Sequence, residues 1–218
     1  MNFNVLTQQS VAREAFFQAA DPVEVALMIA NSAPANAADL QAIVIQHLGD
    51  IEAELRGADT YLVRQFWHNK GKNGEAPFDE NYCRDLLLDK LRNRLTALDV
   101  HVEREASAAA DKRADMRAEI MRGGQRVTVP IEVKKENHVE LWTAWRSQLQ
   151  HLYTIDPAAG GYGLYLVLWF GHQPRSTPDK TKPRDAAHLQ ELILDLIPEL
   201  ERHRLAVRVL DLSLPAAS

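Results

Sequence analysis

The sequence predicts an α/β protein in which a mixed central sheet is flanked by helices. From residue 79 onward, amphipathic helical segments alternate with short apolar strands. The run at residues 162–170 is apolar on both faces, as expected for a strand buried inside a sheet. The adjacent glycines Gly123 and Gly124 are typical of a two-residue hairpin turn. The order of elements predicted from residue 79 is α-β-β-β-α-β-α-β.

The chain before this region has the composition of helices. Helical segments are expected there at residues 11–20, 23–31 and 38–55. Asp39 is expected to cap the third helix, and Gly49 and Gly57 to weaken or end it. Residues 69–77 have the composition of a loop. This loop divides the predicted domains, which are a helical linking or docking extension at residues 1–76 and the main domain at 77–218.

The main domain begins with a helix expected at residues 79–98, which carries Cys83, Leu87, Leu91 and Leu98 on one stripe. The remaining expected elements are a strand at 100–106, hairpin arms at 113–121 and 126–135, helices at 139–153 and 186–203, and strands at 162–170 and 205–212.

The register of the hairpin follows from its turn. If the two glycines form the loop, Arg122 pairs with Gln125, and Asp115 falls opposite Glu132 at the far end of the arms. The alternation of side chains agrees, because one face of the hairpin is then entirely apolar. That face carries Met116, Ala118, Ile120, Val127, Val129 and Ile131.

The other face of the hairpin carries Asp115, Glu132 and Lys134. Like charges directly opposed on antiparallel strands are destabilising, so the two carboxylates need positive charge between them. A divalent metal ion beside Lys134 is the predicted solution.

The residues on this hairpin resemble the PD-(D/E)xK nuclease superfamily, which has the restriction-endonuclease-like αβββαβ core. The resemblance covers roughly residues 78–212, and Ala114 stands where the proline that names the motif would be. It rests on Arg113-Ala114-Asp115, the segment from Pro130 to Lys135, Gln148, and the strand from Gly163 to Gly171. An acidic-x-basic triplet alone also occurs by chance, about three times in a chain of this composition, and then marks a solvated strand face.

The resemblance implies a hydrolytic site. Asp115 and Glu132 would bind one or two Mg²⁺ or Mn²⁺ ions, with the backbone carbonyl of Val133 as a third ligand. The metal would activate a water molecule and neutralise charge on the scissile phosphate. Lys134 would orient or help deprotonate the water and stabilise the transition state. The products would carry a 5′-phosphate and a 3′-hydroxyl.

Two further residues are candidates for this site. Glu80 lies on the inward stripe of its helix and is expected to bind the metal; alternatively, behind an N-cap at Asp79, it only complements the helix dipole. Gln148 lies one helical turn from Trp145, and the resemblance gives it a contact with the nucleic-acid backbone or the catalytic water. The alternative is an ordinary exposed glutamine.

Basic and aromatic residues suggest where nucleic acid would bind. Lys135, Arg113 and Arg117 are expected to form a local phosphate-binding patch, the alternative being ordinary solvated charges. Trp142 and Trp145 could stack on bases, but their spacing also suits packing of a helix on the sheet.

Composition restricts the partners. The net charge of −5 over 218 residues excludes a general basic field, so any nucleic-acid site must be local. The single cysteine excludes an internal disulfide. Neither a signal peptide nor an apolar run of membrane-spanning length is visible, so a cytoplasmic location is expected.

The predicted function is a Mg²⁺-dependent nuclease, a hydrolase that cleaves DNA as the effector module of a larger bacterial protein in defence or genome maintenance. The N-terminal helices would join a partner protein or a sensor domain, and homodimerisation is left open. The alternatives are a non-catalytic module that uses the nuclease fold to bind nucleic acid or protein, and a nuclease directed at RNA. Metal-dependent cleavage separates catalysis from binding alone.

Overall fold

The computed structural model describes residues 33–57, 62–69, 74–104, 114–171 and 177–215. The chain divides into two compact units, Met1–Ala33 and Pro34–Ser218, and the second contains every element described below. The helices expected at residues 11–20 and 23–31 lie outside the described residues.

A five-stranded sheet forms the centre of the second unit, in the order β3-β4-β5-β6-β7. The strands are β3 (His101–Arg104), β4 (Met116–Arg122), β5 (Gln125–Lys135), β6 (Gly163–Trp169) and β7 (Leu205–Asp211). Pairing is antiparallel from β3 to β5 and parallel from β5 to β7. The general class predicted from the sequence, a mixed sheet flanked by helices, is therefore confirmed.

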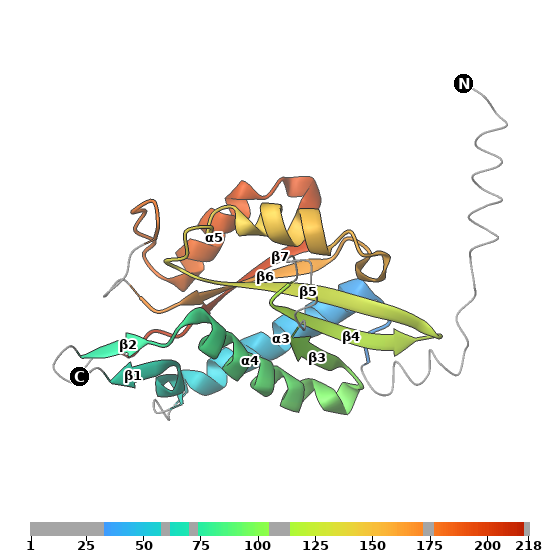
Figure 1. The fold of residues 1–218 in the computed structure, drawn as a ribbon, viewed down its shortest axis with the longest axis horizontal. Coiled ribbons are helices and arrows are strands. Elements are labelled where there is room, and N and C mark those ends of the chain that lie inside the picture. Colours follow the sequence, from blue (N-terminus) through green and yellow to red (C-terminus); the bar gives the residue numbers. More distant parts are fainter. Residues whose placement is uncertain (1–32, 58–61, 70–73, 105–113, 172–176, 216–218) are drawn as a thin grey trace, which may run out of the picture. The chain divides into compact units, whose positions relative to one another are not determined.

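Helices cover both faces of the sheet (Figure 1). One face packs against α3 (Ala37–Leu55) and α4 (Glu80–Leu95), and the other against the π-helix η4 (Trp145–Tyr153) and α5 (Ala186–Leu196). Two separate apolar cores result, one on each side of the sheet. The strand β6 contributes to both, which explains why the sequence is apolar on both of its faces.

The hairpin of β4 and β5 has the predicted register. Arg122 pairs with Gln125, and the pairing runs without interruption to Met116 and Ile131. Both residues of the loop have positive φ, 51° at Gly123 and 75° at Gly124. Glycine adopts this conformation without steric cost, so the turn fixes the register of both arms.

Pro130 lies within β5 without a bulge, although a proline cannot donate to a ladder. Backbone amides alternate along a strand, and the amide of Glu136 donates to the carbonyl of Leu168 on β6. The amides of even-numbered β5 residues therefore point towards β6. Pairing with β6 begins only at Ile131, so a proline at position 130 costs no strand-to-strand hydrogen bond.

The helix α3 belongs to the sheet's own core, which differs from the domain division predicted at residue 76. Its buried residues follow helical spacing. The side-chain amide of Gln41 donates through Nε2 to the carbonyls of Gly163 at 2.8 Å and Arg204 at 2.7 Å. The helix also begins differently, because Asn36, and not Asp39, is the N-cap. Gly49 lies inside the helix without ending it. The fully buried members of its apolar stripe are Leu40, Val44, Leu48, Ile51 and Leu55.

Other boundaries differ modestly. Trp67–Asn69 (β1) and Glu75–Pro77 (β2) pair as a two-stranded ribbon within the segment expected to be a loop. The helix α5 ends at Leu196 and not near residue 203, because Pro198 disfavours helical backbone at the residue before it. The helix expected at 139–153 becomes helical only from Ala144 onward. No helix in the described part of the chain has the length and apolar character needed to cross a membrane.

Candidate active site

The candidate site lies where β4 and β5 stop pairing. After the last pair, Met116 with Ile131, β5 runs on to Lys135 without β4 beside it. The odd-numbered amides of this part of β5 therefore have no strand to donate to on that side. Two carboxylates accept from them: Asp115 Oδ2 from the amide of Val133 at 2.9 Å, and Glu80 Oε2 from the amide of Lys135 at 2.8 Å. The geometry of the sheet edge thus explains why both acids lie here, since buried amides must be satisfied.

Three of the predicted catalytic residues meet at this edge. Lys134 Nζ forms an ion pair with Glu132 Oε1 and lies 3.8 Å from Asp115 Oδ2. The side chains of Glu132 and Lys134 face the second core, because they pair with Tyr165 and Val167 across β5 and β6. Only 1% of Glu132 and 6% of Lys134 is exposed. The lysine therefore joins two carboxylates in a largely desolvated environment.

Burial controls the protonation of this group. It raises the pKa of Glu132 to about 8, the negative charge of Asp115 adds to the rise, and Lys134 opposes it. For Lys134, burial lowers the pKa, but attraction to Glu132 and Asp115 outweighs it and the net pKa is raised. Lys134 thus remains charged at neutral pH, whereas Glu132 changes protonation close to it.

Arg84 is a member of the cluster that the sequence analysis missed. It is 5% exposed, and its guanidinium donates to Asp115 Oδ1 at 3.2 Å, Asn81 Oδ1 at 2.8 Å and Asp85 Oδ1 at 2.9–3.0 Å. Its position offered a signal, because Arg84 lies one helical turn before Leu88 on the buried stripe of α4. A basic residue on an apolar stripe indicates a buried acidic partner.

Glu80 connects the cluster to α4. Asp79 caps the helix by accepting from the amide of Tyr82 at 2.8 Å, so Glu80 lies in the first turn as expected. Its carboxylate faces β5 and contributes to the raised pKa of Glu132. Both predicted roles, at the cluster and at the helix start, are compatible with this position.

Gln148 has a different partner. Its amide donates to Glu140 Oε2 at 2.8 Å, which joins η4 to the turn before it. Trp145 is buried in the second core and donates to the carbonyl of Trp142, so this tryptophan packs the helix on the sheet, as the structural alternative predicted.

Two of the three residues expected to form a phosphate-binding patch, Lys135 and Arg117, contact groups of the protein itself. Lys135 is 4% exposed and donates through Nζ to the carbonyl of Phe78 at 2.6 Å, because odd-numbered β5 residues point towards α3 and α4. Arg117 pairs with Glu119 on its own strand at 3.1 Å. Arg113 lies outside the described residues.

Within the described ranges, no group of three or more His, Cys, Asp or Glu side chains is arranged to hold a metal ion. The chemistry of the donors nevertheless suits a hard cation, because Asp115 and Glu132 offer carboxylate oxygens. Lys134 and Arg84 supply the positive charge that these carboxylates contact here.

Fold and site together define a mixed α/β protein with a buried acid–lysine cluster at the end of its central strand, β5, where β4 and β5 stop pairing. Residues 58–172 match the family described as a domain of unknown function, DUF8371. The match spans more than half of the chain, from before β1 to the end of β6, and the chain belongs to this family. No protein with a curated description and no solved structure matches the chain.

Proposed function

We propose that this protein is a metal-dependent phosphodiesterase that cleaves DNA, built on a restriction-endonuclease-like core. The observation that carries the proposal is the meeting of Asp115, Glu132 and Lys134 at the point where β4 and β5 separate. The order of elements from α4 to β7 supports it, since it agrees with the order implied by the resemblance to PD-(D/E)xK nucleases.

Each residue has a role that its environment supports. Asp115 is held by the amide of Val133 and by Arg84, which fixes the direction of its carboxylate. Mg²⁺ or Mn²⁺, held by Asp115 and Glu132, would activate water and neutralise the phosphate. Lys134 keeps its proton at neutral pH and directs positive charge towards the phosphate oxygen that gains charge in the transition state.

The biological role that we infer is that of an effector module in bacterial defence or genome maintenance. The inference is motivated by the lack of a sequence-reading motif in the chain, and it assigns recognition to a partner protein or a fused domain.

The test is a cleavage assay with the full chain on plasmid, linear and single-stranded DNA and on RNA, with Mg²⁺, Mn²⁺ or EDTA. Lys134→Met removes the charge at similar length and should lower the rate about a hundred- to a thousand-fold. Asp115→Asn and Glu132→Gln should abolish cleavage by removing carboxylate ligands. Lys90→Met, on the outer part of α4, is the matched control and should cleave as the wild type does. Metal-dependent cleavage by Lys134→Met at the wild-type rate would contradict the assigned role.

A binding module without catalysis is the second candidate. The observation that favours it is that Lys134 and Arg84 already neutralise Glu132 and Asp115. Such a module would bind DNA in the same assay without cleaving it in either metal.

A further inference from the structure

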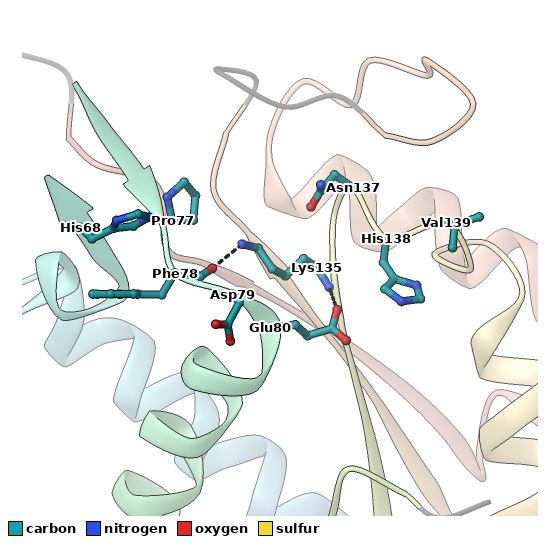
Figure 2. Close-up of a pocket in the computed structure, with 9 residues that line it drawn as sticks. All are labelled: His68, Pro77, Phe78, Asp79, Glu80, Lys135, Asn137, His138 and Val139. Carbon is teal, nitrogen blue, oxygen red and sulfur yellow. Dashed lines mark hydrogen bonds between the residues drawn. The ribbon is translucent and has the colours of Figure 1, made fainter. Parts of the chain in front are cut away.

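A cavity of about 600 Å³ lies beside the candidate site (Figure 2). It opens between the β1–β2 ribbon, the start of α4 and the segment that follows β5. Glu80 belongs to both the cavity and the site, and Lys135 follows Lys134 directly in β5. The residues that line it are His68, Pro77, Phe78, Asp79, Glu80, Lys135, Asn137, His138 and Val139.

Aromatic rings form one side of this cavity. His68 stacks on Phe78 with centroids 4.9 Å apart and planes at 23°, and Phe78 contacts Tyr82 at 4.2 Å. His68 belongs to β1, Phe78 to the link between β2 and α4, and Tyr82 to α4, so the three rings are held by separate parts of the fold. Phe78 is partly buried against the first core, which limits its movement. Phe78 is thus covered by His68 on one face and by Tyr82 on the other, and the face of His68 turned away from Phe78 is the surface on which a flat ring could stack.

Hydrogen-bonding groups form the opposite side. Figure 2 shows Asn137 and His138 across the cavity from His68 and Phe78. His138 Nδ1 accepts from the amide of Glu140 at 3.1 Å, so a neutral ring carries its proton on Nε2. Asn137 brings both a donor and an acceptor, which are the groups that read the edge of a base.

Charge decides which part of a nucleotide can enter. Two carboxylates, Asp79 and Glu80, line the cavity and repel phosphate. The ammonium of Lys135 is buried and directed at the carbonyl of Phe78, 4.7 Å above the ring of Phe170. The cavity therefore suits the neutral base, and the phosphate belongs at Lys134.

We propose that this cavity binds an unpaired nucleobase of a DNA strand whose neighbouring phosphate lies at the Asp115–Glu132–Lys134 cluster. The base stacks on His68, which Phe78 supports from its other side, and presents its edge to Asn137 and His138. In a duplex, a base is stacked between its neighbours and its pairing edge is hydrogen-bonded to the opposite strand, so it cannot enter the cavity. The substrate is therefore single-stranded or locally unpaired DNA. The proposal rests on the proposed function and adds the class of substrate to it.

Binding in EDTA tests the cavity separately from cleavage. The probes are a fluorescent single-stranded DNA, the same strand annealed to its complement, the same strand with one abasic position, and the matching RNA. The variants are Phe78→Leu, which keeps apolar volume without the ring, and His68→Ala. Met121→Ala, an exposed residue near the hairpin turn, is the control, and thermal melts check that each variant is folded.

The wild type should bind the single-stranded DNA more tightly than the duplex. Phe78→Leu and His68→Ala should each weaken this binding about ten-fold, and Met121→Ala should leave it unchanged. Walking the abasic position along the strand should locate one position where the missing base weakens binding to the wild type but not to His68→Ala. If the intact and the abasic strand bind the ring variant equally tightly, the base at that position contacts the ring that the variant lacks.

Binding that is equally tight in folded Phe78→Leu and His68→Ala, or that favours duplex over single strand, overturns the proposal. Tighter binding of the RNA than of the DNA overturns the choice of DNA. Base-dependent binding with no cleavage in any metal would remove the proposed function and keep the cavity's role. Metal-dependent cleavage at the wild-type rate in both ring variants would remove the cavity's role and keep the proposed function.

Discussion

At the scale of single residues, Glu132 has the most unusual environment among the candidate site residues. It is 1% exposed, and burial and the charge of Asp115 raise its pKa to about 8 despite the contact with Lys134. Active sites are where such shifts concentrate, because a group must change charge close to the working pH. A purely structural ion pair is also buried in many proteins, so the distinguishing evidence is how Glu132 responds to protons and to metal.

The first response concerns pH. The pKa of Glu132 is about 8 in the folded protein and near 4.5 when unfolded, so the folded state holds more protons between these values. The contribution of Glu132 to the free energy of unfolding is therefore fully present below pH 4.5 and is lost as the pH rises through 8. The loss is on the order of a few kcal/mol. Glu132→Gln mimics the protonated acid and should remove this dependence.

Urea unfolding at pH 5, 6, 7 and 8 measures the effect as the wild-type value minus the Glu132→Gln value. That difference should become steadily less favourable to the wild type as the pH increases. The control is Glu103→Gln, which removes a carboxylate that is 55% exposed on β3. A difference that stays flat across this range for Glu132→Gln would show that the carboxylate is not buried as described.

The second response concerns metal. If Asp115 and Glu132 bind Mg²⁺, the ion stabilises the folded state by mass action, by about 1.4 kcal/mol at ten times its dissociation constant. The midpoint of thermal unfolding should rise with Mg²⁺ or Mn²⁺ in the wild type and not in Asp115→Asn. A midpoint that millimolar metal leaves unchanged in both proteins would count against a metal site at this edge.

At the scale of elements, α4 connects the first core to the site. Its buried stripe packs on the sheet, while Arg84 and Glu80 reach the end of β5. The thiol of Cys83, on the same stripe, is fully buried and contacts the carbonyl of Phe78 at 3.7 Å. The position of the site's carboxylates thus depends on how firmly α4 is docked.

Cys83 offers a direct measurement of that docking. Burial raises the pKa of its thiol to about 12, so the reactive thiolate is scarce in the folded protein at neutral pH. It is the single cysteine of the chain, and labelling by a thiol reagent should therefore be slow in native conditions and become fast in urea. Arg84→Gln should accelerate native-state labelling if its contact with Asp115 helps to hold α4. Fast labelling of the folded wild type would show that α4 opens readily.

At the scale of the whole molecule, α3 decides where the folded unit begins. Five fully buried side chains of this helix complete the first core, and Gln41 donates to carbonyls at the starts of β6 and β7. Removing α3 would expose this apolar surface of the sheet and remove the hydrogen bonds that Gln41 donates to those two carbonyls.

Two truncated chains should therefore behave differently. Residues 34–218 should unfold cooperatively, with a transition close to that of the full chain, because they contain the complete compact unit. Residues 77–218 should fail to fold or should aggregate, since the first core then lacks α3. Circular dichroism melts and gel filtration provide the comparison. A cooperative unfolding transition in residues 77–218 would instead support the domain boundary at residues 76 and 77 that the sequence predicted.

The sequence predicted best where local chemistry decides the structure. The register of the hairpin follows from Gly123 and Gly124 together with the alternation of side chains, and the observed pairing agrees from Arg122–Gln125 to Met116–Ile131, one position short of Asp115 and Glu132. Position 36 was missed as a cap because Asn36 and Asp39 both suit a helix start, and only the backbone geometry separates them. The same limit applies to domains, because an apolar helical stripe does not reveal which surface it covers.

The residues around the cluster, Arg84 and Lys135, were harder to predict than Asp115, Glu132 and Lys134 at its centre. Arg84 is close to Asp115 only through the docking of α4, a contact between residues 31 positions apart. Lys135 was expected on an open surface, but strand alternation directs it into the layer of α3 and α4. Both cases depend on tertiary packing, which one sequence does not specify.

The strand β5 exchanges neighbours at Ile131, antiparallel with β4 before it and parallel with β6 after it. As the chain is synthesised, the local hairpin can close in about 1–10 µs, so Asp115 and Lys134 meet early and in water. The parallel partner β6 arrives later, after the crossover through η4, and such non-local pairing is slow. We therefore expect Asp115 and Lys134 to meet before they are enclosed, and the raised pKa of Glu132 to arise only in the finished chain, since burial is its main cause.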